Sequence, residues 1–120
     1  VVGPSAIAFN HNSPIPAALN IEGIEQITDA FVQAAKRSIE AGFKVIEIHA
    51  AHGYLLHEFL SPLSNHRTDE YGGSFENRTR LLREIIQKVR EVLPESYPVW
   101  VRISATDWLD NGWDTEQSIA

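Results

Sequence analysis

The chain has 120 residues, a net charge of −6 and no cysteine. This length suits one modest domain, the negative charge argues against nucleic-acid binding, and the lack of cysteine excludes disulfides, thiolate catalysis and cysteine-based zinc sites. No apolar run approaches the roughly 18 residues of a membrane-spanning helix, so no membrane partner is expected, and a cysteine-free composition fits a cytoplasmic protein. The sequence contains no methionine, not even a first one, which predicts a piece of a longer protein.

The first half of the chain predicts surface chain, then a helix, then a strand. Residues 1–20 are rich in proline, asparagine and serine, which is typical of irregular surface chain. Apolar residues recur at three- and four-residue steps from Ile24 to Ile39, which predicts an amphipathic helix. Gly42 is placed for a left-handed C-cap. The run from Phe43 to Ile48 is apolar and rich in β-branched residues, which predicts a short buried strand.

A long loop, residues 50–73, connects this strand to a second helix. Connections of about 2–6 residues are usual in α/β units, so this loop is expected to have a function. Tyr54–Leu60 is expected to form a helical turn or two, and Tyr71–Gly73 a turn that needs a positive φ. The second helix is predicted to begin after Ser74 as its N-cap and to stop at Pro94.

The end of the chain repeats the pattern and indicates the fold class. Val99–Ile103 predicts a second strand, and Asp114 is expected to cap a third helix. Alternating helices and strands indicate parallel strands joined by right-handed crossovers. Two strands cannot close a barrel or cover their own edges, and a complete (β/α)8 barrel takes about 250 residues. The fold class is therefore α/β, with the chain interpreted as a central slice of a (β/α)8 TIM barrel, about two βα units long.

Three polar side chains, His49, His52 and Tyr54, follow the first predicted strand within a few residues. Ligands bind at the carboxyl ends of parallel strands in α/β folds. Two histidines that converge on one oxygen could stabilise negative charge there, or they could bind a metal. A tyrosine phenol keeps its proton at neutral pH, so Tyr54 suits a general acid better than a general base.

A metal site is the weaker interpretation of these histidines. The sequence from His57 begins like the metalloprotease signature H-E-x-x-H, but Ser61 occupies the position of the second histidine. Glu47 is expected to point to the opposite face of the strand from His49, so no third ligand is apparent. A metal-dependent hydrolase or lyase that uses His49, His52 and His57 remains an alternative.

Arg102 lies within the hydrophobic run VWVRIS. A buried cation without a partner is costly, so Arg102 is expected to be buried and to meet an anion, a carbonyl-rich group or a carboxylate. Adjacent strand ends would bring it to the same barrel mouth as His49. Polar residues around the long loop are interpreted as scaffolding, and these are Asn65, Arg67, Asp69, Glu76, Asn77 and Arg78. The three tryptophans are expected to be packing residues, and these are Trp100, Trp108 and Trp113.

The segment GFKVIEIHAAHGYLLHEFLSPLSNHRTDEYGGSFENR resembles the central segment of the old yellow enzyme family, the flavin-dependent ene-reductases also called NADH:flavin oxidoreductases. PSAIAF and VRISATDW are similar to neighbouring segments of that family. Histidine rather than asparagine at position 52 resembles the branch that includes thermophilic-like bacterial enzymes and their fungal relatives. The resemblance implies an FMN-bearing (β/α)8 barrel that uses NADPH or NADH to reduce the activated C=C bond of an α,β-unsaturated carbonyl compound.

The resemblance also implies roles for particular residues and partners. His49 and His52 would bind the substrate carbonyl oxygen, and Tyr54 would protonate the α-carbon. Arg102 would contact the flavin ring, with His49 as a further cofactor-binding residue. The implied partners are a small enone substrate and a nicotinamide cofactor, and a homo-oligomer of the parent protein remains open.

Parts of the family pattern lie outside these residues, including the N-terminal flavin-contacting segment, the glutamine that contacts the flavin ring and the C-terminal phosphate-binding loops. Residues 1–120 alone are therefore expected to bind FMN weakly or not at all, and to be inactive as an isolated fragment. A non-catalytic truncated barrel fragment is a further alternative.

Overall fold

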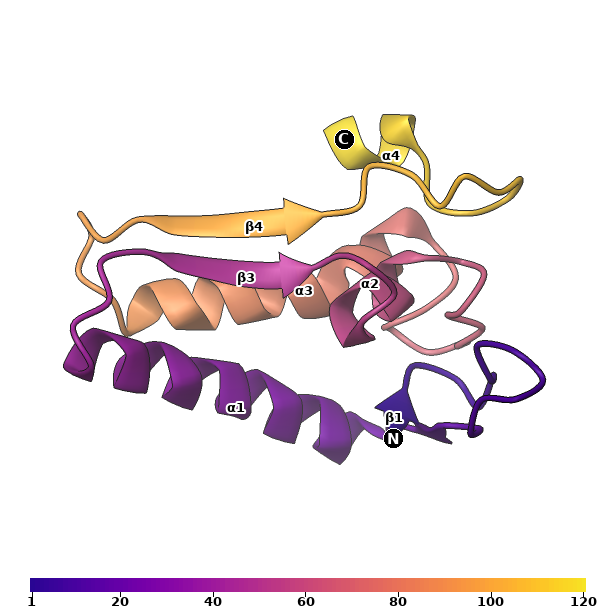
Figure 1. Ribbon diagram of the computed structural model, residues 1–120, viewed down its shortest axis with the longest axis horizontal. Helices are drawn as coiled ribbons and strands as arrows, with labels where there is room; N and C mark the ends of the chain where they lie inside the picture. The colour runs from indigo at the N-terminus through magenta and orange to yellow at the C-terminus, as the bar shows by residue number, and fades with distance from the viewer.

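The computed structural model describes residues 1–120. The elements in chain order are β1 (Val2–Gly3), β2 (Ala17–Ala18), α1 (Ile21–Glu40), β3 (Ile46–Ala50), α2 (Leu55–Leu60), α3 (Phe75–Glu91), β4 (Val99–Ile103) and α4 (Thr115–Ile119). Strands β3 and β4 pair in parallel, and helices α1 and α3 lie on one side of them (Figure 1). The protein is thus a small α/β slice whose longer strands, β3 and β4, are parallel, as the sequence predicts.

Capping side chains set the first residues of three of the helices, α1, α3 and α4. Asn20 caps α1, and its side-chain oxygen accepts from the backbone N–H of Gly23 at 2.8 Å. Ser74 caps α3, as predicted, and accepts from the N–H of Asn77 at 3.2 Å. Asp114 caps α4, also as predicted. A helix leaves its first N–H groups without intrahelical partners, so these oxygens fix where each helix begins.

The first predicted strand is displaced along the chain. The sequence predicts Phe43–Ile48, whereas β3 runs from Ile46 to Ala50. Pairing starts at Ile46 because β4, which begins at Val99, offers a partner only from that point. His49 therefore lies inside the strand rather than just past it.

The N-terminal segment is more regular than expected. The sequence predicts irregular chain over residues 1–20, but Val2–Gly3 and Ala17–Ala18 form two short parallel strands. The prediction was wrong here because a two-residue bridge between distant segments leaves no periodic pattern in the sequence.

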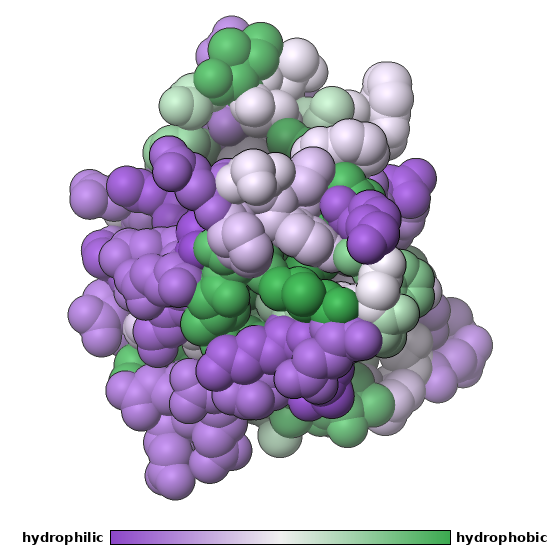
Figure 2. All heavy atoms as spheres, turned by 90° about the vertical axis from the view of Figure 1, so that its left-hand side faces the viewer, coloured by the Kyte–Doolittle hydropathy of each residue, from purple (hydrophilic) through white to green (hydrophobic).

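The core lies between the helices and one face of the β3–β4 sheet. Its fully buried residues come from α1, β3, α2 and α3, and include Ile24, Ile48, Leu56, Phe59, Leu81, Ile85 and Val89. Figure 2 views the end at which β3 and β4 begin, and it shows apolar atoms between hydrophilic ones. Trp113 is buried, as expected, whereas the other two tryptophans are exposed: Trp100 by 60% and Trp108 by 89%. Trp100 is exposed because it lies on the face of the sheet that these helices do not cover.

The long loop is ordered by hydrogen bonds to carbonyl groups. The buried amide of Asn65 donates to the carbonyls of Phe59 and Tyr71 at 2.7 and 2.8 Å. Arg67 donates to the carbonyl of Pro4 at 3.1 Å and forms an ion pair with Asp69. These contacts confirm the scaffolding role expected for Asn65, Arg67 and Asp69.

Two further residues confirm this scaffolding role, and one does not. Arg78 donates to the carbonyls of Leu60 and Gly73 at 2.8 and 2.6 Å. Asn77 donates to the carbonyl of Gly72 at 3.1 Å. The carboxylate of Glu76 makes no hydrogen bond or ion pair and is exposed, because it faces solvent in the first turn of α3, so the expectation for Glu76 was wrong.

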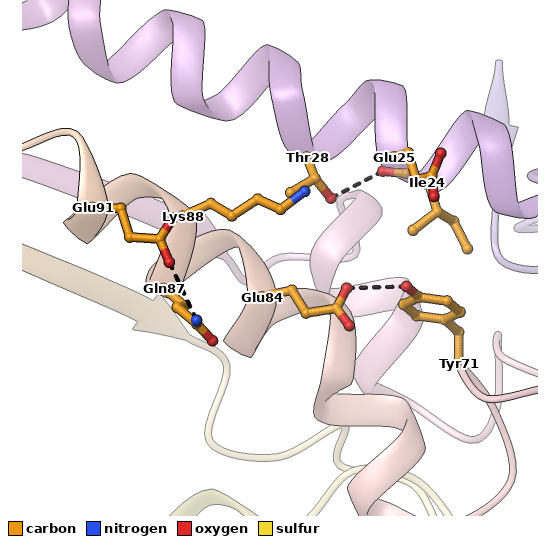
Figure 3. Close-up of a pocket in the computed structure, with 8 residues that line it drawn as sticks. All are labelled: Ile24, Glu25, Thr28, Tyr71, Glu84, Gln87, Lys88 and Glu91. Atoms are coloured by element: carbon orange, nitrogen blue, oxygen red, sulfur yellow. Dashed lines mark hydrogen bonds between the residues drawn. The ribbon is translucent and has the colours of Figure 1, made fainter.

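A groove of about 330 Å³ separates α1 from α3 on the outer side of the helices (Figure 3). At one end Tyr71 donates its phenol hydrogen to Glu84 at 3.0 Å, which ties the loop to α3. The other residues that line the groove are mostly charged or polar, and none of the predicted site residues lines it. No helix of the chain has the length and apolar character needed to cross a membrane.

Candidate functional site

The structure brings His49, His52 and Tyr54 together at the end of β3. The ring centroids of His49 and His52 lie 5.1 Å apart, and those of His49 and Tyr54 lie 5.5 Å apart. Tyr54 is 66% exposed, and His52 is also exposed. The exposed phenol and imidazole and the half-buried ring of His49 are therefore close enough to contact one small molecule, which agrees with the clustering that the sequence predicts.

An unusual turn produces this convergence. His52 has φ of 60° and Gly53 has φ of 73°, so two successive residues are left-handed. Histidine is one of the few residues besides glycine that enters this region with any frequency. The backbone N–H of His52 donates to the hydroxyl of Ser104, just after β4, at 3.0 Å. The N–H of Gly53 donates to Nδ1 of His57 in α2 at 2.8 Å.

His57 takes no part in a metal site. Its Nε2 is 2.8 Å from Oδ1 of Asp107, and its Nδ1 accepts the hydrogen bond from Gly53. Both ring nitrogens are thus occupied within the fold, and no group of three histidine, aspartate or glutamate side chains in the chain could hold a metal ion. The alternative of a metal-dependent enzyme using His49, His52 and His57 was wrong for this reason.

Arg102 and Glu47 both differ from expectation. Arg102 is opposite His49 in the parallel register, but it is exposed and makes no hydrogen bond or ion pair. The expectation of a buried Arg102 was wrong because this face of the sheet is left open. Glu47 is on the same face as His49, since residues two apart in a strand share a face. The expectation that Glu47 points to the opposite face was therefore also wrong.

Two hollows adjoin the three side chains. His49 and Tyr54 line an apolar groove of about 330 Å³ against α1, whose other walls include Ile27 and Phe31. His52 lines a second cavity of about 440 Å³, between α2, the N-terminal segment and the chain after β4. Glu58 also lines this second cavity, and burial raises the pKa of its carboxyl. Apolar surroundings with a few polar groups are typical of sites for small molecules.

The hydrogen-bonding residues behind the turn were not found from the sequence as parts of the site. The available signal was their position: Ser104 and Asp107 come just after β4, as His49 and His52 come just after the predicted first strand. His57 was considered only as a metal ligand. Its pairing with Asp107 joins residues 50 positions apart, which no local pattern indicates.

Comparisons with known proteins agree with this geometry. The chain is 60% identical over 111 residues to an NADH:flavin oxidoreductase of Gibberella zeae, covering 92% of this chain and 27% of the relative. It is 57% identical over 119 residues to an NADPH dehydrogenase of Bacillus subtilis, covering 99% of this chain and 35% of the relative. The chain thus spans about a third of the length of these relatives.

Solved structures of three related enzymes superpose on the chain. A 2-naphthoyl-CoA reductase in complex with 2-naphthoyl-CoA has a TM-score of 0.93 at 36% identity, over 98% of this chain and 18% of that one. Old Yellow Enzyme from Pichia sp. AKU4542 has a TM-score of 0.82 at 43% identity, over 87% of this chain and 29% of that one. Morphinone reductase in complex with tetrahydroNAD has a TM-score of 0.85 at 34% identity, over 98% and 36%.

These likenesses are matched by a family assignment over nearly the whole chain. Residues 2–119 match the NADH:flavin oxidoreductase / NADH oxidase family. That stretch contains strands β3 and β4 and every side chain of the site described above. The chain therefore belongs to the NADH:flavin oxidoreductase / NADH oxidase family, the oxidoreductases that use FMN and NAD(P)H and include the old yellow enzymes.

Proposed function

We propose that residues 1–120 form the substrate-facing part of a (β/α)8 barrel enzyme that reduces the activated C=C bond of α,β-unsaturated carbonyl compounds with FMN and NAD(P)H. The observation that carries the proposal is the approach of His49 to both His52 and Tyr54, at ring distances of 5.1 and 5.5 Å. Two N–H donors and one phenol at a strand's end suit a substrate that must be polarised at oxygen and protonated at carbon.

Each side chain has a defined task in this reaction. The imidazoles of His49 and His52 donate hydrogen bonds to the carbonyl oxygen, which stabilises the negative charge that develops there when the β-carbon is reduced. Tyr54 donates its phenol proton to the α-carbon, so that hydride and proton together convert C=C to C–C. Its exposed position leaves the hydroxyl free for this transfer.

The residues present fit a flavin on the open face of the sheet. Arg102 is a cation without a partner, in register with His49, and planar guanidinium groups pair well with carbonyl-rich or anionic groups. Arg102, with His49 beside it, would therefore hold the electron-rich edge of the FMN ring system. FMN, when bound, supplies hydride transfer from the reduced nicotinamide to the substrate.

A test separates the two half-reactions in the full-length parent protein. Tyr54→Phe is expected to slow alkene reduction by about 100-fold or more while flavin reduction by NADPH stays within about twofold. His49→Ala is expected to weaken binding of a phenolic ligand by about tenfold or more while FMN stays bound. Tyr97→Phe and His66→Ala are the matched controls. Tyr97 lies before the start of β4, at the opposite end of the sheet from the site, and His66 is an exposed loop residue.

Stopped-flow absorbance of the flavin measures both rates. Equal loss of both half-reactions in Tyr54→Phe would contradict the role of proton donor. A parent protein that binds FMN but reduces no enone would refute the proposed substrate class.

A further inference from the structure

The turn that carries His52 and Tyr54 is held by side chains from two other elements. Residues His52 and Gly53 are both left-handed, and each offers its backbone N–H to a side chain rather than to the backbone. Ser104 receives the first at 3.0 Å and Nδ1 of His57 receives the second at 2.8 Å. A shift of this turn would move His52 and Tyr54 together relative to His49.

Hydrogen bonding fixes the protonation form of His57. Because Nδ1 accepts from Gly53, the ring hydrogen is on Nε2, where it donates to Oδ1 of Asp107 at 2.8 Å. Asp107 is itself held, since Oδ2 accepts from the hydroxyl of Ser61 at 2.6 Å and from the N–H of Trp113 at 2.7 Å. The side chains of His57 and Asp107 are only 11% and 9% exposed. The imidazole is therefore neutral and fixed in orientation.

The same contacts exclude a hydrolytic role for these residues. The hydroxyl of Ser61 donates to Asp107 and not to His57, so the imidazole is not placed to activate it. The imidazole has no nitrogen left for proton transfer, because one is bound by Gly53 and the other by Asp107. What remains for His57 is to hold the turn.

We infer that His57, oriented by Asp107, is a positioning residue that sets the placement of His52 and Tyr54 through the backbone N–H of Gly53. The inference rests on the proposed function of His52 and Tyr54. It adds a residue that acts on His52 and Tyr54 through the backbone, and it joins α2 to the chain after β4 at the wall of the cavity that His52 lines.

Two variants of the full-length parent distinguish the hydrogen bond at Nδ1 of His57 from the one at Nε2. The side-chain oxygen in His57→Asn lies near the place of Nδ1, so it can still accept from Gly53, but it cannot reach Asp107. The amide nitrogen in His57→Gln lies near the place of Nε2, so it can still donate to Asp107, but it leaves Gly53 without an acceptor. The same two substitutions at the exposed His66 serve as controls.

Positioning through Gly53 predicts a split between these variants. In His57→Gln, phenolic-ligand affinity and the rate of alkene reduction are expected to fall about tenfold or more, with flavin reduction by NADPH within about twofold. In His57→Asn both quantities are expected to stay within about threefold of the unchanged protein. Equal losses in the two variants, or losses in both half-reactions alike, would show a merely structural role and overturn the inference.

Two further measurements do not depend on activity. Hydrogen exchange of the Gly53 amide is expected to be faster in His57→Gln than in His57→Asn, and equal exchange in both would contradict the inference. Nitrogen-15 spectra of labelled histidine in the unsubstituted protein are expected to show the Nε2–H form of His57, and an Nδ1–H form would overturn it even if His57→Gln did not fold. An inactive parent with the expected exchange and spectra would count against the proposed function alone.

Discussion

Arg102 lies directly opposite His49 across the paired parallel strands β3 and β4, on the face of the sheet that α1 and α3 leave open. The opposite face carries Ile48 and Ala50, which are buried against the helices. Strand alternation therefore separates a packing face from a face that carries charged and proton-bearing groups. This separation explains how one short strand can serve both the core and the candidate site.

Arg102→Met is expected to weaken FMN binding by the full-length parent about 10- to 100-fold. A hydrogen bond from a charged donor contributes about 1.5–3 kcal/mol, and methionine keeps the apolar stem without the charge. Fluorescence titration of the apoprotein with FMN measures the change. Lys36→Met, which removes an exposed cation from α1, serves as the control. Unchanged FMN affinity in Arg102→Met would remove Arg102 from the proposed flavin site.

Tyr71 predicts a loss of stability in alkaline solution. Burial, together with the hydrogen bond to Glu84, raises the pKa of Tyr71 to about 12. An unfolded tyrosine loses its proton near pH 10, so between about pH 10 and 12 the unfolded state binds fewer protons than the folded state. The free energy of unfolding must therefore fall as pH rises through this window.

Tyr71→Phe is expected to flatten this part of the stability profile, because no phenol remains to titrate. Thermal unfolding at a series of pH values from 9 to about 12 measures the effect, as a difference from the unsubstituted protein. Tyr54→Phe removes an exposed phenol and is expected to leave the alkaline limb in place. An identical alkaline slope with and without the Tyr71 hydroxyl would contradict the argument.

Arg78 ties three segments together from a buried position. Its guanidinium donates to the carbonyls of Leu60 and Gly73 and to the side chain of Gln117 in α4. Burial lowers the pKa of Arg78, although an arginine remains charged at neutral pH. Arg78→Met is expected to lower the free energy of unfolding by about 2–4 kcal/mol, because it leaves buried carbonyls without donors.

Chemical denaturation of the full-length parent measures this loss. Arg83→Met on the exposed side of α3 is the matched control, and it is expected to change stability by about 0.5 kcal/mol or less. Similar destabilisation by both substitutions would mean that the contacts of Arg78 contribute little.

Gly72 is required for space rather than for backbone conformation. A methyl group on Gly72 would lie 2.4 Å from both the carbonyl oxygen and Cβ of Arg67, whereas one on Gly42 would meet nothing within 4 Å. Gly42 has φ of 86°, so alanine there incurs only the left-handed cost of about 1–2 kcal/mol. Gly72→Ala is expected to cost about 3 kcal/mol, since main-chain atoms cannot rotate away. Denaturation midpoints of the two variants show which one loses more stability. A larger loss in Gly42→Ala than in Gly72→Ala would refute the argument.

Short-range signals along the chain were enough to predict the local elements. Capping oxygens at Ser74 and Asp114, and a positive-φ glycine at Gly42, gave the limits of helices because these signals act within one turn of chain. The β4 strand was predicted residue for residue as Val99–Ile103. The grouping of polar residues at the end of β3 was also visible, since it needs only the strand and the residues that follow it.

Which groups are buried and which side chains meet depended on how the elements pack. The hydrophobic run around Arg102 predicts a buried cation, yet Arg102 is exposed. Burial depends on what packs against a strand and not on the composition of the strand. The bond between His57 and Asp107 joins α2 to the chain after β4 across 50 positions. Periodicity reports on neighbours along one element, whereas such a contact follows from how the elements pack, so the residues that hold the His52–Tyr54 turn appear only in the folded chain.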